Sequence, residues 1–149
     1  MSEIKGVNRF KFHEGKVEEF KRLSAQAMDI VRAKDTGTLQ YEIYFNDDQS
    51  ECVVYERHRD SEAVIEHGAH VGHLTEAIFA TGSVSSELLG EPSAELTAMI
   101  AGSGVPLFRP FLSMSRPLTG FDERAPGSVD TSPHRSVRNG TDSCIGIRR

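Results

Sequence analysis

Three of the six histidines fall within the stretch HGAHVGH, at His67, His70 and His73, with Gly68 and Gly72 between them. On a helix these spacings put the three rings on one broad side, but the outer two stand about 9 Å apart along the axis. One helix therefore cannot wrap three imidazoles around an ion, and the HExxH pattern of zinc proteases is absent. We expect no metal site. Two alternatives stay open: surface histidines at a helix break, or a general base at His67 or His70.

A polar amide, Asn8, interrupts the apolar pattern of the stretch IKGVNRFKF. Strand alternation places Asn8 on the side of Phe10 and Phe12, which is the side expected to face the helices. A buried amide needs hydrogen-bond partners, and these are either neighbouring backbone groups or a ligand. A histidine facing Asn8 across a cavity would give a base and an oxyanion donor for a hydroxyl-bearing ligand.

Two further charged residues admit alternatives. Glu56 shares a strand face with Val54, so it either pairs with a cation such as Arg9 or Arg59 or lies near a pocket mouth. Arg109 either binds an anionic ligand or contacts a partner subunit. The sequence contains no Gly-rich phosphate loop, nucleophile elbow or P-loop, and therefore no recognisable motif for a nucleotide cofactor.

Composition limits the class of protein. The 149 residues are 38% hydrophobic and 26% charged, with a net charge of −5, which predicts one soluble domain that does not bind nucleic acid. No apolar run approaches the ~18 residues of a membrane span, and the N-terminal residues lack the apolar core of a signal peptide. We therefore expect a cytoplasmic protein with no membrane partner. Cys52 and Cys144 lie in very different settings, so no disulfide is expected.

The elements that must position these residues follow from the periodicity of the apolar side chains. Residues 4–14 alternate as a strand. From Val17 onward, apolar residues recur at helical spacing for about 18 residues, up to the turn KDTGT. Two strands, TLQYEIYF and ECVVYERH, then form an antiparallel hairpin around a short polar turn. The first of them is expected to place four apolar side chains on one face: Leu39, Tyr41, Ile43 and Phe45.

The second half of the chain continues to alternate between helix and strand. Asp60 is a good N-cap for a helix that we expect to break at Gly72 and to resume beyond it. A short strand, SVSSELLG, precedes a helix that Pro92 opens. In the stretch VPLFRPFLSM, two prolines restrict a strand to a sheet edge or to a swap onto a partner. This order of elements predicts a ferredoxin-like α+β sandwich.

Both faces of the predicted sheet need cover, because the strand ECVVYERH is apolar on both sides. Helices can cover only one face in so short a chain, so we expect the other face to meet a second copy in a homodimer. Residues 1–115 are expected to form the domain. Residues 116–149 are rich in Pro, Gly, Ser, Thr and Arg and lack periodicity, which predicts a disordered tail.

The stretch AKDTGTLQYEIYFNDDQSECVVYERHRDSEAVIEHGAHVGHL resembles the antibiotic biosynthesis monooxygenase family. Members of that family typically show a Lys-Asp/Glu-x-Gly turn, a YE strand, an ER or EW strand and an A-x-x-x-H helix, and the likeness extends over about residues 4–114. The resemblance implies a dimeric α+β barrel with a pocket between sheet and helices in each subunit. Characterised branches include cofactor-independent oxygenases acting on quinols and anthrone-like polyketides, and haem-degrading enzymes.

Several residues match positions that face the pocket in members of the family. Asn8 matches an asparagine of the first strand, and His67 or His70 is the nearest match to a helix histidine. His73 is similar in position to a second histidine of quinol monooxygenase-like relatives. The chain departs from the haem-degrading branch and from some polyketide oxygenases, which use a pocket tryptophan, because it has no tryptophan.

The resulting hypothesis is a cofactor-independent monooxygenase that uses molecular oxygen as co-substrate and acts on a quinol or another phenolic, polyketide-like aromatic molecule. The alternatives are a non-catalytic protein that binds an aromatic ligand or haem, and an isomerase or cyclase on the same fold. The expected catalytic residues are Asn8, His67 and His70, and the expected substrate-binding residues are Phe10, Phe12, Tyr41 and His73.

Overall fold

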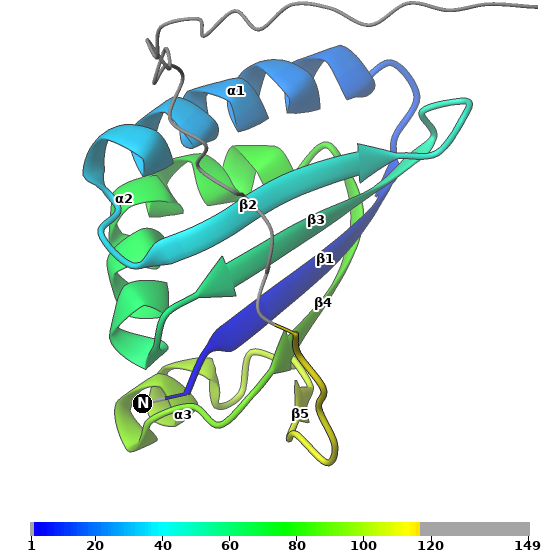
Figure 1. Ribbon diagram of the computed structural model, residues 1–149. Helices are drawn as coiled ribbons and strands as arrows, with labels where there is room; N and C mark the ends of the chain where they lie inside the picture. The colour runs from blue at the N-terminus through cyan, green and yellow to red at the C-terminus, as the bar shows by residue number, and fades with distance from the viewer. Residues whose placement is uncertain (1, 117–149) are drawn as a thin grey trace, which may run out of the picture. The chain divides into compact units, whose positions relative to one another are not determined.

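A computed structural model describes residues 2–116, which form five strands and three helices (Figure 1). In chain order these are β1 (Ile4–Phe12), α1 (Val17–Lys34), β2 (Thr38–Phe45), β3 (Glu51–His58), α2 (Ser61–Phe79), β4 (Gly82–Leu89), α3 (Ala94–Ile100) and β5 (Leu107–Phe108). The predicted order of elements and the ferredoxin-like α+β fold are confirmed. Strands β1 to β4 and helix α1 lie where the apolar periodicity predicts them.

The five strands form one sheet in the order β2-β3-β1-β4-β5. β1 lies between β3 and β4 and pairs antiparallel with both, while the two-residue β5 pairs parallel with β4 at the edge. In this register Asn8 stands opposite Val54 on one side and Ser86 on the other. Tyr41 of the edge strand β2 stands opposite Glu56. Residues far apart in the sequence therefore share the middle of one sheet face.

The long helices α1 and α2 lie side by side on that face, and the sheet's other face is turned away from them (Figure 1). Phe20 of α1 packs on Phe10 of β1 with ring centroids 5.0 Å apart. A second cluster joins Ala27 and Val31 of α1 to Val71 of α2. Burying such side chains contributes roughly 1.5–3 kcal/mol for each large one, so packing of the amphipathic faces stabilises both helices.

The predicted break of α2 at Gly72 is wrong, because α2 runs without interruption from Ser61 to Phe79. Its N-terminus is capped as expected: the Asp60 carboxylate accepts a hydrogen bond from the Ala63 backbone N–H at 2.9 Å. A helical glycine costs about 1 kcal/mol relative to alanine. Packing of α2 against the rest of the domain outweighs that cost. The periodicity of the sequence alone does not reveal this packing.

Two smaller expectations also differ from the structure. Leu39 is 48% exposed, because the register shifts between Thr38 and Gln40 and leaves Leu39 out of the alternation. The helix expected to open at Pro92 begins at Ala94 and is capped by the Ser93 hydroxyl. In the first case a local register shift moves one side chain out of the alternation, and in the second the cap moves the start of the helix by two residues.

The C-terminal part of the sequence is described only as far as residue 116. The predicted strand in VPLFRPFLSM is limited to Leu107–Phe108 and lies at the sheet edge, as its prolines require. The predicted disordered tail lies, except for its first residue, outside the described residues, so the boundary at residue 115 stays a prediction. No helix within residues 2–116 is long and apolar enough to cross a membrane.

We expect Gly72→Ala to raise the free energy of unfolding by about 0.5–1 kcal/mol, measured by urea denaturation. Gly72 is helical and exposed, and a Cβ added there meets no atom within 4 Å. Gly82→Ala should do the opposite, because its Cβ would overlap the backbone carbonyl of Lys11. A loss of stability in Gly72→Ala would contradict the continuous helix.

Candidate functional site

A cavity of about 190 Å³ lies between the inner face of the sheet and the two long helices. Most of its wall is apolar, but several polar side chains reach it from the sheet and from α2. The residues on which the chemistry depends are Asn8, Phe10, Tyr41, Glu56, His67 and Gly68. Asn8 and Glu56 come from neighbouring strands of the same face, and His67 stands on the helix above them.

Asp35 lies behind this cavity, at the C-terminal end of α1, and its side chain is only 1% exposed. Its two carboxylate oxygens contact the Nδ1 atoms of His67 and His70, each at 2.7 Å. The Thr38 hydroxyl donates a third hydrogen bond at 2.7 Å. Burial by itself raises the pKa of Asp35, but the hydrogen bonds from His70, Thr38 and His67 outweigh it and hold the pKa below its ordinary range.

The ionised Asp35 carboxylate fixes the protonation pattern of both imidazoles. A carboxylate without a proton can only accept hydrogen bonds, so the Nδ1 atoms of His67 and His70 must each carry a hydrogen. In the neutral ring the lone pair then resides on Nε2. For His67 this atom lies 4.0 Å from a carboxylate oxygen of Glu56, which also lines the cavity. His67 is thereby oriented as a base directed toward the cavity.

The structure separates the three histidines that the sequence leaves equivalent. His67 is buried and lines the cavity, whereas the His70 side chain is 27% exposed and contacts the opposite oxygen of Asp35. His73 is exposed and is not part of the cavity wall. Of the three, only His67 therefore faces the cavity directly, and His70 is linked to it through Asp35.

A second group of polar residues completes the site. The Nε2 atom of the buried His58 lies 3.4 Å from Glu56, and its Nδ1 lies 3.2 Å from the Thr38 hydroxyl. Thr38 gives its only hydroxyl hydrogen to Asp35, so Nδ1 of His58 must donate to Thr38. With its hydrogen on Nδ1, a neutral His58 ring has only a lone pair on Nε2, and the ionised Glu56 carboxylate is also an acceptor. A hydrogen bond between these two groups therefore needs an additional proton on either Nε2 or the carboxylate.

Of the alternatives open for Glu56, a pair with Arg9 or Arg59 is not formed. Arg9 pairs with Glu87 at 3.7 Å, and Arg59 pairs with Asp60 at 3.0 Å. The alternative expectation, that Glu56 lies at the pocket, agrees with its place in the cavity wall. Its carboxylate adds a second proton carrier to the site, beside His67.

Asn8 lines the cavity, and its orientation is set by the neighbouring strand. The Ser86 hydroxyl donates a hydrogen bond to Asn8 Oδ1 at 2.6 Å. This contact occupies the acceptor side of the amide, and within residues 2–116 no side chain accepts from its N–H groups. The two N–H donors of the amide therefore have no side-chain acceptor among the described residues, and they could donate to an oxygen atom of a ligand.

The predicted aromatic residues are divided between the cavity and the core. Phe10 and Tyr41 line the cavity, and the Tyr41 ring lies edge-on to His67 with centroids 5.8 Å apart. Phe12 lies outside the cavity wall and packs on Phe20 at 4.9 Å. Burial raises the pKa of Tyr41 well above its ordinary value, so its hydroxyl stays protonated and is no base. Burial also raises the pKa of the Cys52 thiol to about 12, which makes it inert.

Sequence reasoning missed Asp35 and His58 as parts of the site. Both stand at the ends of their elements, and nothing in their local pattern shows that their side chains are buried. The family-like turn KDTGT was the only signal, since it includes Asp35 and Thr38. Among residues 2–116, no group of three His, Cys, Asp or Glu side chains is arranged to hold a metal ion.

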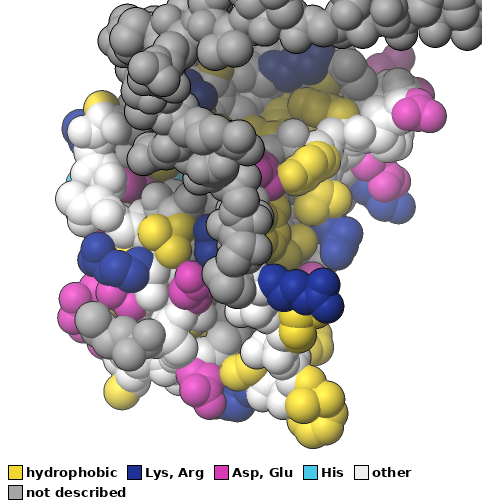
Figure 2. All heavy atoms as spheres, in the orientation of Figure 1, with side chains coloured by type: hydrophobic (Ala, Val, Ile, Leu, Met, Phe, Trp, Pro, Cys, Tyr) yellow, Lys and Arg dark blue, Asp and Glu magenta, His cyan; other side chains and the backbone are white. Residues whose placement is uncertain are grey.

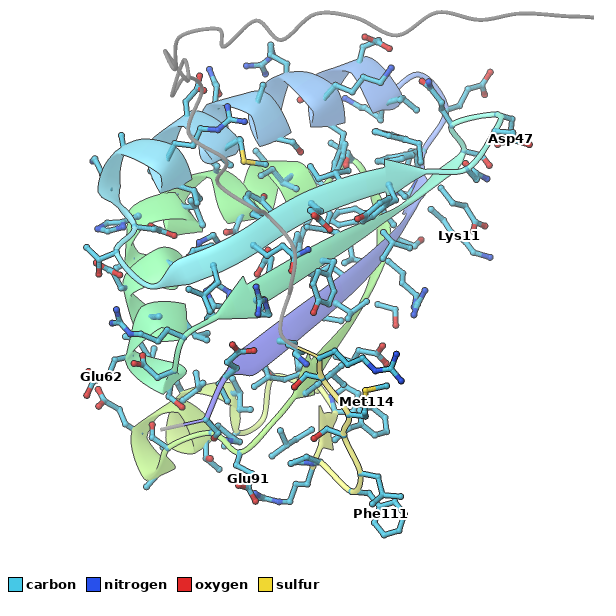
Figure 3. The ribbon with its side chains drawn as sticks, in the orientation of Figure 1. Lys11, Asp47, Glu62, Glu91, Phe111 and Met114 are labelled. Atoms are coloured by element: carbon cyan, nitrogen blue, oxygen red, sulfur yellow. The ribbon has the colours of Figure 1, made fainter. Side chains whose placement is uncertain are left out.

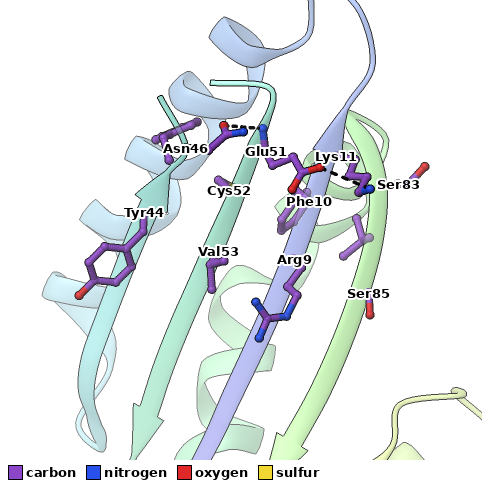
Figure 4. Close-up of a pocket in the computed structure, with 12 residues that line it drawn as sticks. Arg9, Phe10, Lys11, Tyr44, Asn46, Glu51, Cys52, Val53, Ser83 and Ser85 are labelled. Atoms are coloured by element: carbon purple, nitrogen blue, oxygen red, sulfur yellow. Dashed lines mark hydrogen bonds and ion pairs between the residues drawn. The ribbon is translucent and has the colours of Figure 1, made fainter. Parts of the chain in front are cut away.

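A larger hollow, of about 450 Å³, lies at the other face of the sheet (Figure 4). Its wall includes Arg9, Tyr44 and Val53, and the ion pair between Lys11 and Glu51 at 3.4 Å closes one end. No histidine contributes to this hollow. Despite its size it lacks a base with an oriented partner, so the candidate chemistry belongs to the smaller inner cavity.

The model of the antibiotic biosynthesis monooxygenase family matches residues 4–75 of the chain. Among solved structures, the fold is similar to MupZ from Pseudomonas fluorescens, with a TM-score of 0.67 and 20% identity over 78% of this chain and 97% of that one. SnoaB from Streptomyces nogalater, a cofactor-independent oxygenase, has a TM-score of 0.53 and 21% identity over 63% and 97% of the two chains. Rv0793 from Mycobacterium tuberculosis has a TM-score of 0.54 and 23% identity over 62% and 97%.

These likenesses confirm the fold class and the family that the sequence resembles. At such identities the solved structures establish the fold and not a shared substrate. No curated protein sequence matches the chain.

We expect Asp35→Asn to lower the free energy of unfolding at pH 7 by about 1–3 kcal/mol, because the buried donors lose their ionised acceptor. The folded pKa of Asp35 lies below its ordinary value of 3.8, so its stabilisation is full above pH 3.8 and is lost as pH falls below it. The difference between the two proteins should therefore shrink below that pH in urea titrations. Asp29→Asn is the matched control, since Asp29 is 81% exposed on α1. An equal effect at both positions would argue against the buried network.

Proposed function

We propose that this protein is a cofactor-independent monooxygenase that acts on a quinol or another phenolic aromatic molecule in the inner cavity, with molecular oxygen as co-substrate. The observation that carries the proposal is the pair of groups facing the cavity. His67 presents Nε2 with Asp35 behind it, and Asn8 presents amide N–H groups from the sheet. We further propose that the protein acts in the cytoplasm and needs no nucleic-acid or membrane partner.

In the proposed reaction, His67 Nε2 takes the proton of the substrate hydroxyl. The Asp35 carboxylate stabilises the imidazolium that forms, and it keeps the ring in the orientation needed for the transfer. The Asn8 amide donates to the phenolate oxygen, and Phe10 and Tyr41 hold the ring. A phenolate is more electron-rich than the phenol, which favours its reaction with dioxygen.

The electron balance requires no bound redox group. For a benzene-1,4-diol, one oxygen atom of O2 enters the ring and the other leaves as water, giving a hydroxyquinone. The four electrons that reduce dioxygen come from the substrate, and its protons leave with the water. The protein supplies only the base, the oxyanion donor and an apolar enclosure.

A second candidate function is an isomerase or cyclase, and the position of Glu56 favours it. Glu56 and His67 lie 4.0 Å apart in the same cavity, so one could remove a proton while the other returns it. Such a reaction consumes no oxygen. Conversion of substrate under strict anaerobiosis would select this function over the monooxygenase.

The haem-binding alternative is not favoured by the size of the cavity. About 190 Å³ is below the range of roughly 300–1,000 Å³ that drug-sized ligands occupy. Haem is larger than most such ligands. The cavity suits a small aromatic molecule better.

Oxygen uptake with a panel of hydroquinones tests the proposed reaction. His67→Ala should lower kcat by about 100-fold or more, because a positioned general base contributes that much. Asn8→Ala should lower it at least about tenfold through loss of the oxyanion donor. His70→Ala should have a smaller effect, since His70 acts only through Asp35.

His13→Ala is the matched control, because His13 is exposed in the turn after β1 and lies outside the cavity wall. Its rate should equal that of the unchanged protein. Equal rates in His67→Ala, Asn8→Ala and His13→Ala would exclude the proposed site.

We also propose that the protein is a homodimer formed through the outer face of the sheet, the arrangement typical of the family. That face carries hydrophobic side chains among charged ones (Figure 2), including Tyr44 at 57% exposure. Beyond β5, Phe111 is 90% exposed and points away from the sheet (Figure 3). Large apolar side chains that remain exposed on a sheet face favour association with a second copy.

Tyr44→Lys should raise the dissociation constant of the dimer at least about tenfold, because a charge would be buried between the two sheets. Light scattering over a concentration series measures it. Met99→Lys is the control, since Met99 is 60% exposed on α3 rather than on the sheet. A monomeric unchanged protein at micromolar concentration would contradict the proposed dimer.

A further inference from the structure

Gly68 is a glycine that the fold itself does not require. It lies inside α2, outside the group of residues with positive φ, and a Cβ added there meets no atom within 4 Å. Neither backbone strain nor close packing therefore excludes a side chain. A glycine at such a position costs the helix about 1 kcal/mol relative to alanine. The reason for a glycine at position 68 therefore lies outside the stability of the helix.

Gly68 stands at the boundary between the cavity and solvent. It is exposed, and it is also part of the cavity wall. Thr75 and Phe79 lie within about 20° of it around the helix and belong to the same wall. Gly72 is turned about 40° further from His67 around the helix, is exposed and lies outside the wall. The side of α2 with Gly68, Thr75 and Phe79 thus edges an opening.

The size of the cavity makes this opening important for any ligand. An apolar protein cavity of about 150 Å³ holds one benzene molecule. The cavity beside His67 has about 190 Å³, which is enough for one ring with small substituents. A larger substituent on that ring must leave the cavity, and Gly68 offers space where every other residue would place a Cβ.

We propose that Gly68 determines the specificity of the cavity. It lets a single-ring phenol enter with its hydroxyl toward His67 and Asn8 while a narrow para substituent extends past α2 into solvent. This inference rests on the proposed function, because it assumes that a phenol occupies the cavity. It adds the substrate class: monocyclic phenols or hydroquinones with a linear side chain, rather than fused-ring polyketides.

The test compares the binding of two redox-stable probes, 4-ethylphenol and 4-hexylphenol, by isothermal titration calorimetry. The proteins are the unchanged chain, Gly68→Leu and Gly72→Leu. Leucine is a strong helix former, so both variants should fold, and far-ultraviolet circular dichroism with the urea midpoint checks this. Gly68→Ala serves as a second, smaller obstruction at the same position.

Gly68→Leu should weaken the binding of 4-hexylphenol at least tenfold and that of 4-ethylphenol by less than threefold. Gly72→Leu should leave both affinities unchanged, and Gly68→Ala should give an intermediate loss for 4-hexylphenol. Unchanged binding of 4-hexylphenol in Gly68→Leu, or equal losses for both probes, would overturn this inference alone. Failure of both phenols to bind the unchanged protein would overturn the proposed function and this inference with it.

Discussion

The buried carboxylate of Asp35 is the constraint on which the site depends. A charge with 1% exposure must be satisfied by donors, and these come from the start of β2 and from two residues within one turn of α2. Meeting that requirement docks the end of α1 against α2 and the first residue of β2. The same contacts require the ring hydrogen of His67 to be on Nδ1, and they direct its Nε2 to the cavity. One electrostatic requirement therefore both stabilises the fold and orients the candidate base.

The two-residue period of the strands gives the sheet two surfaces with different properties. Along β1, Asn8 and Phe10 face the helices and the cavity, while Arg9 and Lys11 face the opposite hollow. The candidate site and the surface proposed for a second copy are thus separated by the thickness of one sheet. A shift of strand register by one residue would exchange the two sets of side chains. The register shift at Leu39 lies at the beginning of β2, and the rest of the strand keeps its inner and outer faces.

The strand residues of the candidate site were predictable from the sequence. For the helix α2 the sequence indicated a histidine but not which of the three faces the cavity. Alternation placed Asn8, Phe10 and Tyr41 on the face that lines the cavity, as the structure has them. For α2 the pattern HGAHVGH showed three histidines on one broad side but not which one is buried. The supposed break at Gly72 followed from glycine propensity, which packing of α2 on α1 outweighs.

The sequence by itself determined the order of elements, the inner face of the sheet and the residue types available for acid-base chemistry, because these depend on local periodicity and on side-chain pKa values. Only the tertiary structure decided that Asp35 lies behind His67, that Glu56 lies beside His67, and that the exposed Gly68 is part of the cavity wall. Each of these contacts joins residues about 10 to 30 positions apart or depends on how one helix is rotated about its axis. Such contacts are set by packing of whole elements, which no local pattern encodes.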